Sequence, residues 1–561
     1  MVPTEIQKNI IQCDGNVVVL ASPGSGKTFV LSEKIRRVLK ENISLDYQGV
    51  IAISYTRKAS ANLKKRTLGD GIQNKNSFFG TIDNFCLTQI IETFGNYTFG
   101  RSSKDIEVKG LNELDNNGKK LFEWIDEIHP DYTDIEESQF ADLKELFRQG
   151  YVLVESLELL AFHIIKNSSA CQKYLQARYK YVFIDEFQDA DTYTNELFLL
   201  LLDLGLTGIA VGDVNQSIFG FSHKDSIYLK SLVKNPNFTS FTLGDNFRCS
   251  IPIINYSNRL LDENSNILDT DKEGMYLVRV NGSEYNIAEY IDNEIESIKS
   301  KWSVTDNSEI AILVKNERTQ KIIDENLENP HRLVRTTSLD MDLNPKSRLY
   351  TLLLCYYFDD SVSFMSVLDE YVEYETLTLY ERNRLHEESL VVKSIEETDI
   401  DQLSNHFKVI ADILLPRIQD GASLQKLNKT LASEKDLESY KPMSSNEIQV
   451  MTLHKSKGLE FDVVFHLNMS DWELPYKQIE NGDFNNPQYP NWEQDLNLHY
   501  VGITRARKAC YLVRGTQRTN SYDCLKNAKD SEFLDIHSLD SLRNDIWYGF
   551  KKNRYVKSNI R

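Results

Sequence analysis

The sequence lacks long apolar runs, and no stretch approaches the ~18 residues that a membrane-spanning helix needs. It also lacks, at its start, the basic residues and apolar core of a secretory signal peptide. Cysteine is scarce, and the odd number without paired spacing argues for reduced thiols and against a zinc site. The seven cysteines are Cys13, Cys86, Cys171, Cys249, Cys355, Cys510 and Cys524. We therefore expect a cytoplasmic protein.

Positive charge is in short supply, because 64 Lys and Arg stand against 83 Asp and Glu, for a net charge of −19. Contacts with nucleic-acid phosphates need Lys and Arg, so the average surface argues against casual nucleic-acid binding. A local basic groove can still coexist with an acidic exterior, and an acidic face can instead serve a protein partner. The 561 residues, 41% of them apolar, suffice for about three or four domains with ordinary cores.

The strongest motif is a glycine-rich loop between an apolar run, expected to be a strand, and a helical pattern. Gly24 and Gly26 leave room for backbone N–H groups to converge on phosphate oxygens at a helix N-terminus. Lys27 is expected to reach the terminal phosphates, and Thr28 to offer its hydroxyl to Mg²⁺. The strict phosphate-loop pattern would begin with Gly where this chain has Ala. The whole predicted loop is Ala21, Ser22, Pro23, Gly24, Ser25, Gly26, Lys27 and Thr28.

A second strong signal is a buried-strand pattern that ends in two acids, Asp185 and Glu186. In a phosphate-loop ATPase one carboxylate holds the metal and the next can polarise the attacking water. Asp185 fits the first role and Glu186 the second. Paired acids also end strands on ordinary surfaces, so this assignment depends on the phosphate loop. Together the two motifs predict ATP and Mg²⁺ as cofactors.

Other predicted strand ends carry side chains that suit nucleotide chemistry. Gln216 could sense a terminal phosphate, and Arg248 could face the transferred phosphoryl group. The amide of Gln7 could read the donor and acceptor edge of adenine. Aromatic side chains able to stack on bases are Tyr55, Phe219 and Phe221. Taken singly, an ordinary core or surface position is the better interpretation of each of these residues except Tyr55, for which the two interpretations are about equal.

In their order, these segments resemble the successive motifs of the UvrD/Rep-type superfamily 1 DNA helicases. The segments are ASPGSGKT, YTRKA, GTID, VFIDEFQD, VGDVNQSIFGF, NFR, TLHKSKGLEF and YVGITRAR, and the match runs from residue 7 to about 507. The resemblance implies an α/β fold of two RecA-like domains with parallel sheets, with ATP between them and a mostly helical insertion in each. The implied ranges are 1–92 and 166–250 for the first domain, 93–165 for its insertion, 251–345 and 443–561 for the second domain, and 346–442 for its small insertion.

The resemblance also implies roles for individual residues. Gln7 would read adenine, Phe247 would lie against it, and Glu460 would lie near the ribose. Gln216 would couple the γ-phosphate to DNA. Arg248 and Arg505 would be two arginine fingers from opposite sides of the cleft. The positions that would face DNA are Tyr55, Thr81, Phe219, Phe221 and His454.

The chain departs from the family pattern at three places. Phe29 stands where the family commonly has Arg, and Asp83 stands where a His is common. The segment 221–223 replaces the usual Trp-Arg-Gly, which removes a large stacking ring and a cation. These changes weaken the expected grip on DNA and leave the ATP machinery intact. ATP hydrolysis is therefore better supported than duplex separation.

Two functions follow from the sequence. The first is an ATP-dependent 3′-to-5′ DNA translocase or helicase that acts on single-stranded or tailed duplex DNA. In its length and its small second insertion, the chain resembles the helicase-like subunits of Gabija anti-phage defence systems. This resemblance implies a partner nuclease or ATPase subunit in a hetero-oligomeric complex. The alternative is a regulatory subunit that senses nucleotide and DNA ends and activates a partner nuclease with little unwinding. A metabolic phosphate-loop kinase would leave the motifs between 448 and 507 unexplained.

Overall fold

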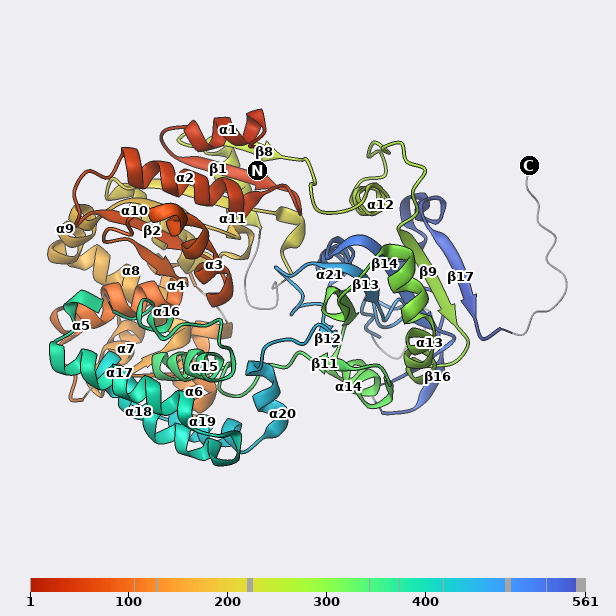
Figure 1. Ribbon diagram of the computed structural model, residues 1–561. Helices are drawn as coiled ribbons and strands as arrows, with labels where there is room; N and C mark the ends of the chain where they lie inside the picture. The colour runs from red at the N-terminus through yellow and green to blue at the C-terminus, as the bar shows by residue number, and fades with distance from the viewer. Residues whose placement is uncertain are drawn as a thin grey trace.

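The computed structural model describes residues 2–550 apart from 105, 128–129, 219–225, 343, 373, 417, 480–485 and 521. Figure 1 shows two bodies, each built around one parallel β-sheet. We call the first sheet with its flanking helices the first lobe, and the second sheet with its helices the second lobe. The two lobes face each other across a cleft, and residues from both line the sites described below.

The first sheet has six parallel strands in the order β3-β2-β6-β7-β1-β8. The strands are β1 (Val17–Ala21), β2 (Gly49–Ile53), β3 (Phe78–Gly80), β6 (Tyr179–Ile184), β7 (Thr207–Gly212) and β8 (Thr239–Leu243). Its central strands are continuous apolar runs, as expected of a parallel sheet that is covered on both faces. The helices of this lobe are α1 (Glu5–Gln12), α2 (Lys27–Glu41), α3 (Arg57–Leu68), α4 (Ile82–Phe85), α9 (Ser169–Arg178), α10 (Thr192–Asp203) and α11 (Ile227–Lys234).

The second sheet has seven parallel strands in the order β11-β12-β10-β13-β14-β9-β17. They are β9 (Met275–Val280), β10 (Ile310–Val314), β11 (His331–Leu333), β12 (Ile448–Thr452), β13 (Phe461–His466), β14 (Ala506–Gly515) and β17 (Asn544–Tyr548). The helices of this lobe are α12 (Ile251–Leu261), α13 (Glu284–Trp302), α14 (Glu317–Asn326) and α21 (Trp492–Thr504), and a hairpin joins β15 (Gln517–Thr519) to β16 (Leu525–Asn527). Separate apolar clusters cover the two faces of this sheet.

Each lobe carries a mostly helical segment between its strands. The first holds α5 (Glu92–Phe99), β4 (Glu107–Lys109), α6 (Asn116–Glu127), α7 (Glu137–Arg148), β5 (Tyr151–Leu153) and α8 (Leu157–Asn167). The second holds α15 (Pro345–Phe358), α16 (Phe364–Leu368), α17 (Leu379–Ser394), α18 (Leu403–Leu414), α19 (Ser423–Leu431) and α20 (Glu434–Leu437). The first shares an apolar core with the first sheet, whereas the second has a core of its own.

The two helical segments contact each other, and both lie on the side of the first lobe in Figure 1. Ile106 and Ile418 form a parallel β-bridge, and Lys426 Nζ donates to Glu113 Oε1 at 2.8 Å. The predicted fold class, α/β with two parallel sheets and helical insertions, is confirmed. Within the described residues, no helix combines the length and the apolarity that crossing a bilayer requires.

Candidate active site

The predicted phosphate loop connects β1 to the start of α2, and its two inner glycines are sterically required. Both have a positive φ, 69° at Gly24 and 85° at Gly26, which an L side chain rarely adopts. A Cβ at Gly24 would lie 2.4 Å from Asn246 Oδ1, and one at Gly26 would lie 2.8 Å from Gln7 Nε2. At these two positions the loop therefore has no room for a side chain, because neighbouring polar groups occupy that space.

Two neighbouring segments hold this loop in place. The buried amide of Gln7 accepts the Thr4 N–H with Oε1 and donates from Nε2 to the Ser25 carbonyl, both at 3.0 Å. The Phe247 N–H donates to the Gly24 carbonyl at 2.9 Å, which attaches the segment after β8 to the loop. The Phe247 ring is 57% exposed, so its face is open to a base. Gln7 thus positions the phosphate loop, while its predicted contact with adenine stays a prediction.

The two predicted acids follow β6, directly across from the loop. Lys27 Nζ lies 3.5 Å from Glu186 Oε1. Burial raises the pKa of Asp185, and the neighbouring charge of Glu186 raises it further. Burial alone would raise the pKa of Glu186, but the positive charges of Lys27 and Lys457 lower it overall. The site therefore contains one carboxyl group that is hard to ionise beside one that stays ionised.

The backbone of Glu186 is in the left-handed region, with φ 57° and ψ 39°. A non-glycine residue there carries strain, which surrounding contacts must offset. One such contact is Gln188, which is fully buried in the turn Phe187–Asp189 and which the sequence reasoning missed. Its Nε2 donates to Glu186 Oε2 at 2.5 Å, and its Oε1 accepts the Asp213 N–H at 2.9 Å. Only its place between the acids of the Asp-Glu-Phe-Gln-Asp segment could have indicated this role.

The residues present fit a Mg²⁺-bound nucleoside triphosphate. Ser25 Oγ is buried, with no hydrogen-bond partner among the described residues, in a loop whose two inner glycines have a positive φ. Lys27 supplies the cation. Thr28 is the second residue of α2, directly after Lys27, whose pKa the charge of Asp185 raises. A hydroxyl and a carboxylate are hard oxygen donors of the kind that suits Mg²⁺. Thr28 and Asp185 are therefore the residues that would hold Mg²⁺, which would neutralise phosphate charge there.

Both predicted arginine fingers lie in the cleft. Arg505 follows α21 in the second lobe and is 1% exposed, and its Nη2 donates to Gln216 Oε1 of the first lobe at 3.3 Å. Burial lowers the pKa of Arg505 to about 10, which leaves the guanidinium charged at neutral pH. Gln216 in turn donates to Asp213 Oδ2 at 2.6 Å. The chain of contacts from Asp213 through Gln216 to Arg505 therefore connects the two lobes.

The second arginine finger pairs with the predicted ribose residue. Arg248 Nε lies 2.5 Å from Glu460 Oε2, and the Arg248 guanidinium also donates to the Thr504 carbonyl of the second lobe. Asn246 holds Arg248 in place by accepting its backbone N–H at 2.9 Å. The structure thus brings Arg248, Arg505 and Glu460 to one side of the phosphate loop.

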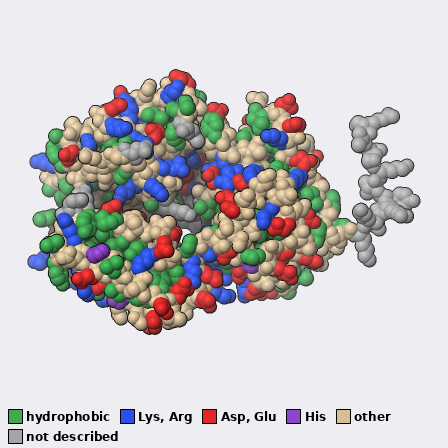
Figure 2. Space-filling view, in the orientation of Figure 1, with side chains coloured by type: hydrophobic (Ala, Val, Ile, Leu, Met, Phe, Trp, Pro, Cys, Tyr) green, Lys and Arg blue, Asp and Glu red, His purple; other side chains and the backbone are tan. Residues whose placement is uncertain are grey.

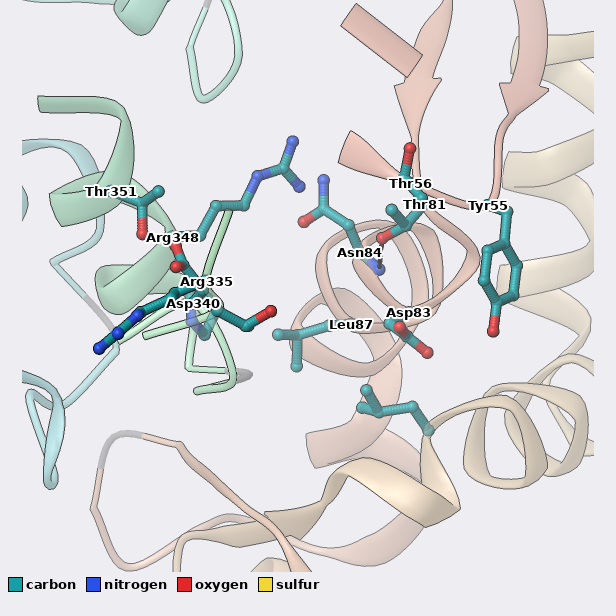
Figure 3. Close-up of a pocket in the computed structure, with 13 residues that line it drawn as sticks. Tyr55, Thr56, Thr81, Asp83, Asn84, Leu87, Arg335, Asp340, Arg348 and Thr351 are labelled. Carbon is teal, nitrogen blue, oxygen red and sulfur yellow. Dashed lines mark hydrogen bonds between the residues drawn. The ribbon is translucent and has the colours of Figure 1, made fainter. Parts of the chain in front are cut away.

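A cavity of about 610 Å³ opens between the first lobe and the start of α15 (Figure 3). One wall carries the predicted DNA positions Tyr55 and Thr81, and the opposite wall carries Arg335 and Arg348, which the sequence reasoning missed. Arg348 points across the cavity toward Asn84, whereas Arg335 points away (Figure 3). The full lining is Tyr55, Thr56, Thr81, Asp83, Asn84, Leu87, Leu157, Arg335, Thr336, Asp340, Pro345, Arg348 and Thr351.

The remaining predicted DNA positions are placed differently. His454 is half-buried in the turn after β12 and is not part of the lining of this cavity. Phe219 and Phe221 lie outside the described residues. Figure 2 shows Lys and Arg side chains around the hollow in the middle of the molecule, although the chain as a whole is acidic. Basic side chains therefore gather around this hollow, and a groove that binds DNA there stays a prediction.

The comparisons with known proteins agree with this arrangement. Residues 5–222 match the AAA domain and residues 358–516 match the UvrD-like helicase C-terminal domain. Gabija protein GajB of Bacillus cereus (strain VD045) is 25% identical, covering 92% of this chain and 96% of that protein. A probable DNA helicase II homolog of Rickettsia conorii is 23% identical (93% and 94%), and ATP-dependent DNA helicase PcrA of Staphylococcus aureus (strain Mu50) is 21% identical (92% and 83%).

Two segments of the chain thus resemble, in chain order, an AAA domain and a UvrD-like helicase C-terminal domain. The predicted resemblance to UvrD-type helicases is confirmed. The narrower resemblance, to a Gabija protein, is also confirmed and extends over both lobes.

Proposed function

We propose that this protein is an ATP-dependent motor on single-stranded DNA, a translocase or helicase of 3′-to-5′ polarity. The observation that carries this proposal is Arg505, a second-lobe guanidinium hydrogen-bonded to Gln216 beside the phosphate loop and acids of the first lobe. Because residues of both lobes would contact the nucleotide, its binding would favour the closed arrangement of the lobes. The polarity comes from the resemblance to the UvrD-type helicases.

The chemistry follows from where each charge lies. Lys27 and the backbone N–H groups of the loop hold the terminal phosphates, and Glu186 orients and deprotonates the attacking water. Arg248 and Arg505 stabilise the charge that develops on the transferred phosphoryl group, because guanidinium donors preorganised in a dry site are most effective there. Hydrolysis removes the charge that attracts Arg505, so the second lobe is released and the cleft opens.

Movement on DNA requires the strand to contact both sides of the cleft. Tyr55 and Thr81 come from the first lobe, whereas Arg335 belongs to the segment that follows the second sheet's strand β11. An aromatic ring can stack on any base, and an arginine can bind any phosphate, so this lining suits a strand of any sequence. Closing and opening the cleft would shift the strand between the two walls.

We also propose a role in an anti-phage defence complex with a partner nuclease or ATPase subunit, supported by the similarity to Gabija protein GajB. The net charge of −19 supports the second candidate, a nucleotide- and DNA-end-sensing subunit that activates a nuclease with little unwinding. In both cases ATP binds at the same cleft.

The test is ATP turnover by the purified chain with and without a single-stranded oligonucleotide. We expect strong stimulation, and an unchanged rate would contradict a motor. Displacement of a strand from a 3′-tailed duplex then separates the two candidates, because robust unwinding by the chain alone excludes the regulatory one. Tyr55→Ala should raise the strand concentration needed for half-maximal stimulation about tenfold, since base stacking contributes about 1–3 kcal/mol per base.

A further inference from the structure

A buried ion pair joins the two lobes at a point that the roles above do not use. Lys457, in the turn after β12, places Nζ 2.5 Å from Asp189 Oδ2 and donates to the Gln216 carbonyl at 2.8 Å. Asp189 and Gln216 belong to the first lobe. The Lys457 side chain is 10% exposed and that of Asp189 is fully buried. Since each charge is shielded from water, removing either partner deprives the other of its paired opposite charge.

On its first-lobe side, this pair is connected through a short turn to the catalytic carboxylate of Glu186. Asp189 ends the short turn that begins after Glu186, and its N–H donates to the Glu186 carbonyl at 3.0 Å. Glu186 is the residue whose backbone lies in the strained left-handed region. Fixing the end of this turn from the second lobe therefore helps to hold Glu186 in a conformation that it would otherwise tend to leave.

The same pair also lies beside the wall predicted to hold DNA. Asp189 lines a second cavity of about 220 Å³ together with Tyr55 and Thr81, the two residues that also line the larger cavity. Lys457 Nζ lies 6.0 Å from the centre of the Tyr55 ring. The turn that follows Glu186 therefore lines the same cavity as two residues proposed to contact the strand.

We propose that Asp189 and Lys457 are positioning residues that couple strand binding to ATP hydrolysis, an inference that rests on the proposed function. A strand that bridges the two walls favours the closed cleft. Closure brings Lys457 onto Asp189, and the pair then holds the turn that orients Glu186. When the cleft opens, the partners separate because they belong to different lobes, and the strained turn relaxes. Hydrolysis is thereby restricted to the strand-bound, closed state.

The test compares Lys457→Met, Asp189→Asn and the double variant, each with and without a saturating oligonucleotide. We expect each single variant to lose at least about tenfold in strand-stimulated kcat, with the KM for ATP changed less than about threefold. The double variant should be no worse than either single one, because both remove the same contact. Lys457→Arg keeps the charge and should recover most of the rate. The matched control is Lys455→Met, since Lys455 Nζ donates to the Val334 carbonyl within its own lobe.

Three outcomes would overturn the inference. Strand stimulation could be unchanged in Lys457→Met and Asp189→Asn, or the losses of the two variants could add in the double variant. Alternatively, Lys457→Met could act only by weakening strand affinity, measured by fluorescence anisotropy, while Asp189→Asn has no effect; Lys457 would then be a simple phosphate contact. Wild-type chain that shows no stimulation would instead contradict the proposed function itself.

Discussion

At the scale of single residues, the ATP site depends on opposite charges held at short range in a dry cleft. Lys27 is the central cation, and the negative charges of Glu186, Asp213 and Asp185 raise its pKa above the ordinary value although burial opposes them. The ammonium group therefore stays charged at any physiological pH. Without nucleotide these acids neutralise Lys27, and with nucleotide the terminal phosphates would share it.

Lys27→Ala should reduce ATP turnover about 100-fold or more, because removing one preorganised electrostatic donor costs about that much in kcat. Lys40→Ala is the matched control, since Lys40 is exposed at the far end of the same helix. Steady-state phosphate release measures both. Turnover that survives Lys27→Ala would refute the assignment of the phosphate loop.

The residues that could be predicted from sequence are those with a motif around them. Lys27, Asp185, Glu186 and Arg505 lie in ordered segments whose spacing is dictated by a strand, a tight turn and a helix. Gln188 and Lys457 could not be assigned, because their roles arise only from contacts across the fold. A buried glutamine between two acids looks like an ordinary turn residue until its amide is seen to contact Glu186 and Asp213.

At the scale of elements, strands with continuous apolar runs could be located in sequence, and their pairing order could not. Parallel strands pair with partners distant in the chain, as β9 does with β14 and β17. The hydrophobic pattern indicates that a strand is buried, but it does not show which strands pair with it. Sequence likewise does not show which helix packs against which strand. A buried histidine pair between β13 and α21, which no motif indicates, is one example.

His466 on β13 and His499 on α21 form this pair within the core of the second lobe. His466 Nδ1 contacts the Leu467 carbonyl at 3.0 Å, and His499 Nδ1 lies 2.9 Å from His466 Nε2. A carbonyl can only accept, so His466 carries its proton on Nδ1 and accepts from His499 with Nε2. Burial lowers the pKa of His466 to about 4 and that of His499 well below its ordinary value. Both rings are therefore neutral in the folded protein.

This pair predicts acid sensitivity of the second lobe. The unfolded chain binds protons at both rings below about pH 6.5, while the folded chain does not, so stability falls as pH drops toward 4. For His466 alone, the free energy of unfolding falls by about 3 kcal/mol between neutral pH and pH 4. In His499→Gln, the slope of unfolding free energy between about pH 6 and pH 5 should fall by about one proton.

Denaturant unfolding at several pH values measures this slope. His386→Gln is the matched control, because His386 is exposed on α17, away from the buried pair. A slope in His499→Gln equal to that of the wild type would mean that the pair does not stay neutral in the folded state.

At the scale of the whole molecule, the lobes contact each other at the nucleotide cleft, and the two helical segments contact each other separately. Arg505, Arg248 and Lys457 make the contacts at the cleft, and the Ile106–Ile418 bridge with the Lys426–Glu113 pair makes those between the helical segments. Sequence indicated two insertions but could not show that they touch, since the contact involves unrelated surface residues. The cavity lined by Tyr55 is bounded by residues of the first lobe, by the segment after β11 and by the start of α15.

The most direct measurement is strand-stimulated ATP turnover of Arg505→Ala, with ATP binding followed in parallel by a fluorescent analogue. Arg507→Ala is the matched control, because Arg507 pairs with Asp462 and Glu309 inside the second lobe. If the two lobes share one ATP, turnover falls about 1,000-fold or more while ATP still binds and the control stays near the wild-type rate. Wild-type turnover in Arg505→Ala would show that the first lobe hydrolyses ATP alone, and would contradict the shared site.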